Sequence, residues 1–361
     1  MKFWILIATI VVVLAAGAAF FIRHDSRISF VDYQLAAAVV EAPTSSPSTA
    51  APVPYEGTVY HVFFHSLIVY PELAYKGRDA AGYKKYMITV SQFKSILESL
   101  YQNGFVLVDI HSIYSVNADG TVVKKTLLIP AGKKPLIISL DDLNYYHTMR
   151  GEGFASKLVL DPRGRVATLV VAPDGTTSIT RDGDVVPILD DFVQKHPDFS
   201  VGGAKGTIAL TGFEGILGYR TEGSSTNRAA EVEAVKPVIA ALKQDGWQFA
   251  SHSYTHQTAF LDKTISLATL VSDTARWQNE VEPLVGPTDI FVGPFGQVFQ
   301  DGDPRRAYLV SQGFKMLCGV GMDRYLRYFP TYVMMDRADI DGYRITHATK
   351  NVEIYFDPTA L

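Results

Sequence analysis

The sequence predicts an α/β domain built on parallel strands. Apolar, β-branched runs alternate with amphipathic helical segments along most of the chain, and this alternation is typical of parallel strands buried on both faces. Polar residues also gather directly after several of these runs. The pattern changes only at residues 153–200, where the turn signals PRG, PDG and RDG separate short apolar runs. These signals predict an inserted β-hairpin or meander.

The first strand is expected within TVYHVFFHSLIVY, residues 58–70. Its period of two places His61, Phe63 and His65 on one face. A helix follows, because Thr89 and Gln92 form a capping-box pattern and Gly104 provides a stop. Two further apolar runs, FVLVDI and KPLIISLDDLNYY, predict strands, and the second ends abruptly in two acids.

The second half repeats this order of elements. TIALTGF, WQFAS, TDIFVGPFG and KMLCGVG are the predicted strands, and KMLCGVG is expected to close the series. The intervening helices are predicted at residues 229–246, ending at a glycine, and at residues 267–286.

Composition excludes several classes of protein. The chain has 361 residues, which is enough for one large domain or two ordinary ones, and a formal net charge of −4. No long basic run is present, so a nucleic-acid partner is not expected. The single cysteine, Cys318, lies in an apolar run, which predicts a buried packing residue and excludes a disulfide within the chain.

The amino terminus predicts membrane attachment. Residues 3–22 carry no charge, and about 20 helical residues span a bilayer core. We expect residues 1–24 to be an uncleaved, single-pass anchor; the alternative is a signal peptide cleaved near AAGAA. Either case places the remaining chain outside the cytoplasm. Residues 25–56 are rich in Ala, Ser, Thr and Pro and predict an extended linker, which leaves residues 57–361 as the folded domain.

Chemically active side chains follow the ends of several predicted strands. Asp141 and Asp142 end one strand, His252 and His256 follow another, and the turn GPFG at residues 293–296 follows a third. His65 ends a fourth. Carboxyl ends of parallel strands meet at one rim, so we expect these groups to come together there.

One aspartate with two imidazoles suits zinc or a similar divalent ion with positions left open for water. The neighbouring aspartate can then act as a base towards that water. The two acids would face opposite ways on a straight strand, but a turn directly after the strand can bring both to the site.

Three of these segments, ISLDDLNYY, SHSYTH and FVGPFG, resemble the first three motifs of the polysaccharide deacetylase family, also called carbohydrate esterase family four. The resemblance covers residues 57–347 apart from the insertion. It implies a distorted (β/α) barrel of about seven strands and a metal-dependent removal of N-acetyl groups from sugars. By position, Asp141 would be the general base, and the metal ligands would be Asp142, His252 and His256. Pro294, Phe295 and Gly296 match a turn whose backbone N–H can stabilise an oxyanion.

The chain also departs from the family pattern. Leu143 stands where the family has glycine after the two acids, and Val292 stands where an arginine is expected. A cation near the base keeps its carboxylate ionised, and Arg337 is our candidate for that role. His347 is the nearest match to the late histidine that protonates the leaving amine; the alternative is a solvated histidine with no catalytic part.

Three further residues are weaker candidates for substrate contact. His65 lies either on the rim or in a purely structural position. Tyr145, next to Tyr146, offers a ring for stacking a sugar or packs under a loop. Arg220 either grips the substrate or forms a surface ion pair.

The sequence thus predicts an extracytoplasmic, membrane-tethered hydrolase that deacetylates a cell-surface or cell-wall polysaccharide, such as peptidoglycan. Two alternatives remain open at this stage. One is a glycan-binding protein on the same fold with weakened chemistry, and the other is an esterase that removes O-acetyl groups.

Overall fold

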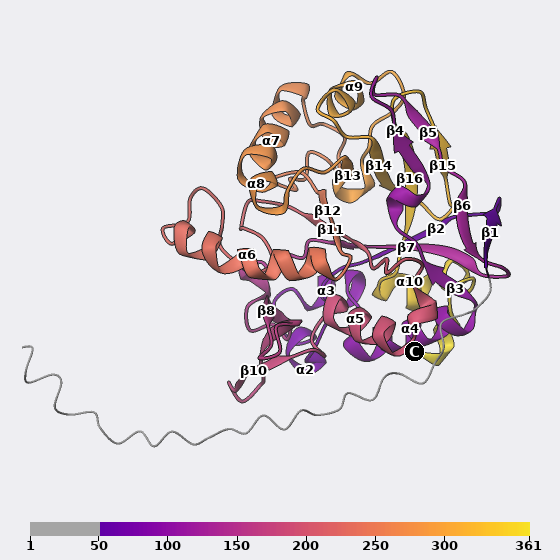
Figure 1. The fold of residues 1–361 in the computed structure, drawn as a ribbon. Coiled ribbons are helices and arrows are strands. Elements are labelled where there is room, and N and C mark those ends of the chain that lie inside the picture. The colour runs from indigo at the N-terminus through magenta and orange to yellow at the C-terminus, as the bar shows by residue number, and fades with distance from the viewer. Residues whose placement is uncertain (1–50) are drawn as a thin grey trace, which may run out of the picture. The chain divides into compact units, whose positions relative to one another are not determined.

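Seven parallel strands close into a barrel in the computed structural model (Figure 1). They follow one another around the ring in chain order, and the last pairs with the first. The strands are β2 (Tyr60–Phe64), β7 (Lys134–Asp141), β11 (Thr207–Leu210), β12 (Gln248–Ser251), β13 (Ile290–Val292), β14 (Met316–Val320) and β16 (Val333–Asp339). The predicted (β/α) barrel is therefore confirmed.

The structure describes residues 51–361, so the predicted anchor at residues 1–24 and most of the predicted linker lie outside the described residues. Within the described part, no helix combines the length and the apolar character needed to cross a bilayer. The end of the predicted linker is ordered, because Pro52–Tyr55 forms strand β1 and pairs with β6 (Leu127–Pro130). The expectation of an unpaired spacer up to residue 56 is wrong for these four residues.

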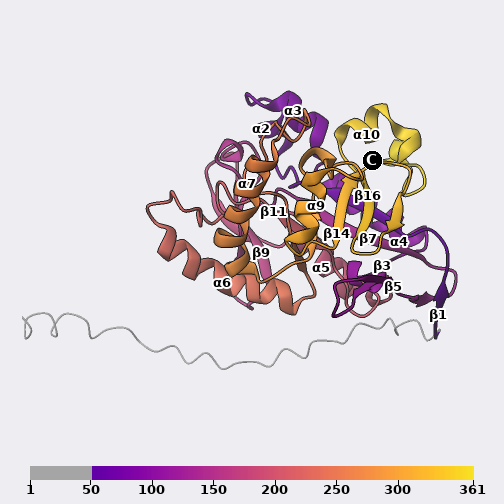
Figure 2. The same ribbon diagram turned by 90° about the horizontal axis from the view of Figure 1, so that it is seen from above.

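Helices cover the outside of the barrel. α6 (Arg228–Gln244) and α7 (Leu267–Glu280) lie on one flank in both views, and α4 (Val90–Gln102) lies on the other (Figure 1 and Figure 2). The shorter helices are α2 (Pro71–Ala74), α3 (Ala80–Tyr86), α5 (Val185–Lys195), α8 (Glu282–Val285), α9 (Pro304–Ser311) and α10 (Gly342–His347).

Local sequence signals account for several helix ends. The capping box of Thr89 and Gln92 opens α4 as predicted, and Gly104 follows its end with φ +77°. The single helix predicted at residues 267–286 is divided into α7 and α8. Pro283 has no backbone N–H with which to continue the α-helical ladder, so the chain restarts in a short new helix.

The strand at residues 315–321 does not close the series. β16 lies between β14 and β2 and completes the ring, and it carries Arg337 on its length. Its sequence, VMMDRAD, mixes charged with apolar residues and so lacks the continuous apolar run expected of a strand buried on both faces.

The insertion at residues 153–200 contains the predicted meander. β8 (Ala155–Leu160), β9 (Val166–Val171) and β10 (Thr177–Thr180) form an antiparallel three-stranded sheet, and α5 follows within the same segment. Four further short strands accompany the barrel. β3 (Phe105–Leu107) pairs with β7, β15 (Leu326–Tyr328) pairs with β16, and β4 (Tyr114–Val116) pairs with β5 (Val122–Lys124).

Apolar side chains fill the lower interior of the barrel, and polar ones replace them towards its carboxyl-end rim. Ile137, Ala209, Ala250 and Cys318 belong to one fully buried cluster. The burial predicted for Cys318 is confirmed. The next inward residue of β7 after Ile137 is Ser139, which hydrogen-bonds His61 on the neighbouring strand β2 at 3.0 Å. The next inward position on β7 is Asp141, which brings charge to the rim.

Candidate metal centre

Asp142, His252 and His256 meet at the carboxyl-end rim of the barrel. One potential ligand atom from each lies within 4.8 Å of those from the other two. Asp142 follows β7 and the two histidines follow β12, so more than a hundred residues separate the acid from the imidazoles along the chain. The structure thus brings together the three ligands that the sequence predicted.

The His252 ring is oriented by its backbone neighbour. Its Nδ1 lies 2.8 Å from the carbonyl oxygen of Val292, so Nδ1 carries the proton and Nε2 is left as the electron-pair donor. Burial lowers the pKa of His252, which favours the neutral imidazole that a cation requires. Val292, the residue that replaces an expected arginine, therefore positions the candidate ligand His252 through its main chain.

His256 is held from two sides. Its backbone N–H donates to the Ser253 hydroxyl at 3.0 Å, and its ring lies 4.4 Å from the Phe295 ring, centroid to centroid. The residue has φ +45°, a left-handed conformation. This conformation ends the turn after β12 and points the second imidazole back towards the first, with 4.8 Å between the ring centroids.

A left-handed residue also separates the two aspartates. Asp141 is the last residue of β7, whereas Asp142 has φ +58° and donates its N–H to the carbonyl of Ala209 at 3.2 Å. This turn lets both carboxylates reach the rim. Asp142 Oδ2 lies 3.8 Å from His256 Nε2, and Asp141 Oδ2 lies 3.8 Å from His252 Nε2.

Arg337 holds Asp141 in a two-pronged ion pair. Its Nη1 donates to Oδ1 at 2.6 Å and its Nη2 donates to Oδ2 at 2.9 Å. Both side chains are buried. Burial alone would raise the pKa of Asp141, but Arg337 and, after it, His252 hold that pKa well below its usual range. Asp141 is therefore ionised.

Further contacts fix the Arg337 guanidinium from three directions. It donates to the Ser139 hydroxyl at 3.1 Å and to the Gly319 carbonyl at 3.2 Å, and it lies 4.2 Å from the centroid of the Phe63 ring. The cation next to Asp141 thus comes from β16, as the sequence hypothesis for Arg337 required.

The donor set suits a divalent transition ion. Two imidazole nitrogens and one carboxylate oxygen are the ligands typical of zinc sites that keep open positions, and they are too few and too nitrogen-rich for a calcium site. Burial on its own would raise the pKa of Asp142, but the neighbouring His256 and His252 outweigh it and lower that pKa. In the part of the chain that the structure describes, this is the group of acidic and imidazole side chains that could hold such an ion.

His65 and the GPFG turn complete the rim. The parallel register pairs Phe64 with Leu140, so His65 extends β2 beside Asp141. The half-buried His65 ring contributes to the lowered pKa of both aspartates, after the larger effects already described. Pro294 is buried, whereas Phe295 has φ +52°, is 45% exposed and covers His256.

Three of the predicted residues lie in other surroundings. His347 is exposed on α10, where its ring stacks on Tyr343 at 5.2 Å between centroids. Tyr145 is buried and donates to Asp184 at 2.7 Å, so its ring offers no face to a sugar. Arg220 donates to the backbone carbonyls of Glu214 and Tyr145, which makes it a brace between two rim loops.

Sequence reasoning missed the side chains that support these ligands. Tyr146, not Tyr145, reaches the candidate metal centre, because its hydroxyl lies 2.6 Å from Asp142 Oδ1. Asn144 is fully buried and bridges to the Thr211 backbone in both directions, at 3.1 and 3.3 Å. These side chains all belong to the DDLNYY segment, residues 141–146. Which of them points to the candidate metal centre depends on the left-handed backbone of Asp142 and Tyr145.

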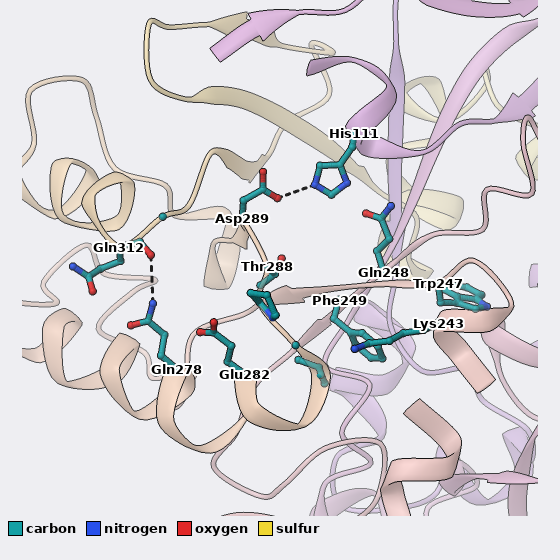
Figure 3. Close-up of a pocket in the computed structure, with 14 residues that line it drawn as sticks. His111, Lys243, Trp247, Gln248, Phe249, Gln278, Glu282, Thr288, Asp289 and Gln312 are labelled. Carbon is teal, nitrogen blue, oxygen red and sulfur yellow. Dashed lines mark hydrogen bonds and ion pairs between the residues drawn. The ribbon is translucent and has the colours of Figure 1, made fainter. Parts of the chain in front are cut away.

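A large cleft lies at the opposite end of the barrel (Figure 3). Its volume is about 670 Å³, and it lies at the amino ends of β12 and β13. His111 Nε2 and Asp289 Oδ1 lie 2.8 Å apart on its wall. In barrels of this kind the amino-terminal face serves stability and the carboxyl ends carry the chemistry. We therefore place the candidate site at the rim and not in this cleft.

No protein-family model and no curated protein matches the sequence. Solved structures do match. A polysaccharide deacetylase from Bacillus cereus is 15% identical with a TM-score of 0.47, covering 84% of this chain and 70% of that one. A deacetylase from Streptococcus pyogenes in complex with acetate is 12% identical, also with a TM-score of 0.47, covering 85% of this chain and all of that one.

A de-N-acetylase from Aggregatibacter actinomycetemcomitans is 16% identical with a TM-score of 0.48, covering 83% of this chain and 100% of that one. At these identities, function has to be inferred from the side chains of the rim.

Proposed function

We propose that this chain is a metal-dependent deacetylase of the polysaccharide deacetylase type, which hydrolyses N-acetyl groups on a cell-surface or cell-wall glycan. One observation carries the proposal: the three candidate ligands Asp142, His252 and His256 share a rim with Asp141, a carboxylate kept ionised by Arg337. This combination provides a cation site and a base side by side, as hydrolysis of an unreactive amide requires.

Asp142, His252 and His256 would hold the divalent cation, with zinc the best fit to their donor atoms. Such a cation, when bound, acidifies water and polarises the acetamide carbonyl. Asp141 accepts the proton of the attacking water. Arg337 holds the pKa of Asp141 well below its usual range, so this acceptor is ionised. A backbone N–H of the turn at Pro294 and Phe295 would stabilise the oxyanion that develops on the substrate.

His65 is better placed than His347 to protonate the leaving amine. His65 lies beside Asp141 by the register of β2 on β7, whereas His347 is exposed on α10 and stacked on Tyr343. General acid catalysis requires the donor within hydrogen-bond reach of the leaving group. The rim position therefore favours His65, and we propose His65 in place of His347 as the proton donor.

Arg337 also bears on the alternative of a catalytically weakened glycan-binding protein. That alternative rested on Val292 and Leu143, the two departures from the family pattern. Arg337 supplies the missing positive charge from another strand. Leu143 is buried, so neither departure removes a charged group that the proposed reaction needs. The other alternative, an O-acetyl esterase, would use the same side chains, so only the preferred substrate distinguishes it from an N-deacetylase.

The polysaccharide substrate and the location outside the cytoplasm are also proposals. They rest on the uncharged segment at residues 3–22 and on the rim chemistry. A tethered enzyme suits a polymer that is fixed in the wall and does not diffuse.

Acetate release from N-acetylated and O-acetylated glucosamine oligomers of matched length tests the proposal. We expect release from the N-acetylated oligomers, its loss on treatment with a chelator, and its loss in Asp142→Ala. Asp174→Ala, in the turn between β9 and β10, is the matched control and should keep full activity. Faster release from the O-acetylated oligomers would favour the esterase, and saccharide binding without any release would favour the binding protein.

A further inference from the structure

A short chain of hydroxyl groups ends on the candidate ligand Asp142. The Tyr146 hydroxyl lies 2.6 Å from Asp142 Oδ1 and 2.7 Å from the Thr211 hydroxyl. Asp142 and Tyr146 follow β7, whereas Thr211 follows β11, so the chain joins two neighbouring strand ends. No step of the proposed reaction uses Tyr146 or Thr211.

The direction of these hydrogen bonds follows from the acceptor at their end. The Tyr146 hydroxyl donates to Asp142 Oδ1, so its single proton points to the carboxylate. The Thr211 hydroxyl must then donate to the Tyr146 oxygen. Donation to a charged acceptor at 2.6 Å is a strong hydrogen bond, and it occupies Oδ1 on the side facing the tyrosine.

The Tyr146 ring is itself held in place. It stacks on Phe213 with 5.0 Å between centroids and an interplanar angle of 18°. The backbone that carries Thr211 is fixed by the buried Asn144 amide. Because the ring cannot swing away easily, its hydroxyl defines one rotamer of Asp142, with Oδ2 directed towards His256 at 3.8 Å.

We propose that Tyr146 is a positioning residue that makes Asp142 a one-oxygen ligand. Because the tyrosine hydroxyl engages Oδ1 and Oδ2 is directed towards His256, Oδ2 is the oxygen offered to a cation together with two imidazole nitrogens. A site of this kind selects ions that accept few ligands, such as zinc, over calcium, which needs more oxygen donors and readily takes both oxygens of one carboxylate. The inference rests on the candidate metal centre of the proposed function and adds the origin of its selectivity.

The rival explanation is that the hydroxyl chain only stabilises two rim loops. The two explanations differ in what the Tyr146→Phe substitution changes. This substitution keeps the ring and its stacking on Phe213 but removes the proton on Oδ1. A purely structural role predicts lower stability with unchanged cation affinity; a positioning role predicts altered affinity and altered selectivity.

The test is equilibrium binding of zinc and of calcium to the metal-free full-length protein, measured by calorimetry with a competing chelator. We expect Tyr146→Phe to bind zinc about 10- to 100-fold more weakly and to discriminate less between zinc and calcium. Tyr343→Phe removes an exposed hydroxyl on α10 and is the matched control, expected to bind as the native protein does. Thermal unfolding of each metal-free variant shows that the fold is intact.

The outcomes separate this inference from the proposed function. Native protein that binds zinc, with Tyr146→Phe binding both ions within twofold of it, overturns the inference alone. Native protein that binds neither ion overturns the metal centre and with it the proposed function. Absorption spectra of the cobalt(II) forms give a second readout, because a change from one to two carboxylate oxygens alters the coordination number and hence the band intensity.

Discussion

Replacing Arg337 by methionine isolates the ion pair that we place at the centre of the site. Arg337 is completely buried and makes two charged hydrogen bonds to Asp141, at 2.6 and 2.9 Å. Methionine retains much of the side-chain volume on Phe63 but none of the charge. The variant therefore leaves an ionised carboxylate buried without its partner.

The expected loss of unfolding free energy is about 3–5 kcal/mol, the usual effect of removing one member of a buried ion pair. A double variant that also carries Asp141→Asn no longer has the unpaired buried charge. The double variant should therefore lose about 1–2 kcal/mol, which corresponds to the neutral hydrogen bonds that remain unmade at Ser139 and Gly319. Adding Asp141→Asn to Arg337→Met should thus increase the unfolding free energy, although each substitution alone lowers it.

Urea denaturation of the native protein, the two single variants and the double variant gives the coupling energy directly. Arg306→Met is the matched control. Arg306 is also buried, but it donates to the carbonyls of Val298 and Phe299 and has no contact with Asp141. Adding Asp141→Asn to Arg306→Met should change stability by the sum of the two single effects.

Acetate release provides the second readout. Arg337→Met should lower kcat/KM by at least about 100-fold, since Asp141 loses the two hydrogen bonds that hold its carboxylate in position to accept a proton. Additive stability effects at Asp141 and Arg337, or unchanged turnover in Arg337→Met, would refute the role given to this pair.

Three further predictions concern single residues. In an acetate-release assay, His65→Ala should lower kcat by about 100-fold or more, and His347→Ala should leave kcat unchanged. The reverse result would identify His347 on α10 as the proton donor. Burial on its own lowers the pKa of His111, but the hydrogen bonds that its ring donates to Asp109 and Asp289 outweigh burial and raise that pKa to about 9. The contribution of His111 to stability is therefore complete below about pH 6.5 and is lost as pH rises through 9. Since the ring is 42% exposed, solvent screening reduces this contribution to about 1 kcal/mol. The unfolding free energies of His111→Asn and of the native protein, measured in urea, should therefore converge by pH 10; a constant difference between them would contradict the prediction. Burial raises the pKa of Asp184 to about 6. The native protein should therefore lose stability relative to Asp184→Asn as pH rises from 4 to 6. Urea denaturation measures this difference, and parallel stability curves over that range would argue against the prediction.

The sequence predicted the parallel strands and their shared rim because both depend on short-range patterns, whereas the barrel and the assignment of the three candidate ligands came from the resemblance to the deacetylase motifs. Apolar runs that alternate with capped helices specify parallel strands, and the ends of such strands necessarily share a rim. Asp142, His252 and His256 could thus be grouped before any coordinates were known. The capping box at Thr89 shows the same dependence on neighbouring residues.

The misplaced residues depend on backbone conformation or on long-range packing. Tyr145 and Tyr146 are adjacent and chemically identical, and only φ +51° at Tyr145 sends one into the core and the other to Asp142. Arg337 could be suggested as a substitute cation, but its strand was missed because VMMDRAD mixes charges with apolar residues. The buried charge of Arg337 is accommodated because Asp141 lies opposite, almost two hundred residues away in the chain.

Anomalous X-ray diffraction at the zinc edge, on crystals of the protein soaked with zinc, tests the central claim most directly. We expect one strong peak at the rim, within bonding distance of Asp142 Oδ2 and of Nε2 of both His252 and His256, and no such peak in crystals of His252→Ala. A rim without a peak at saturating zinc, or a peak held by other side chains while these three remain unbound, would contradict the assignment of this rim as a metal-dependent site.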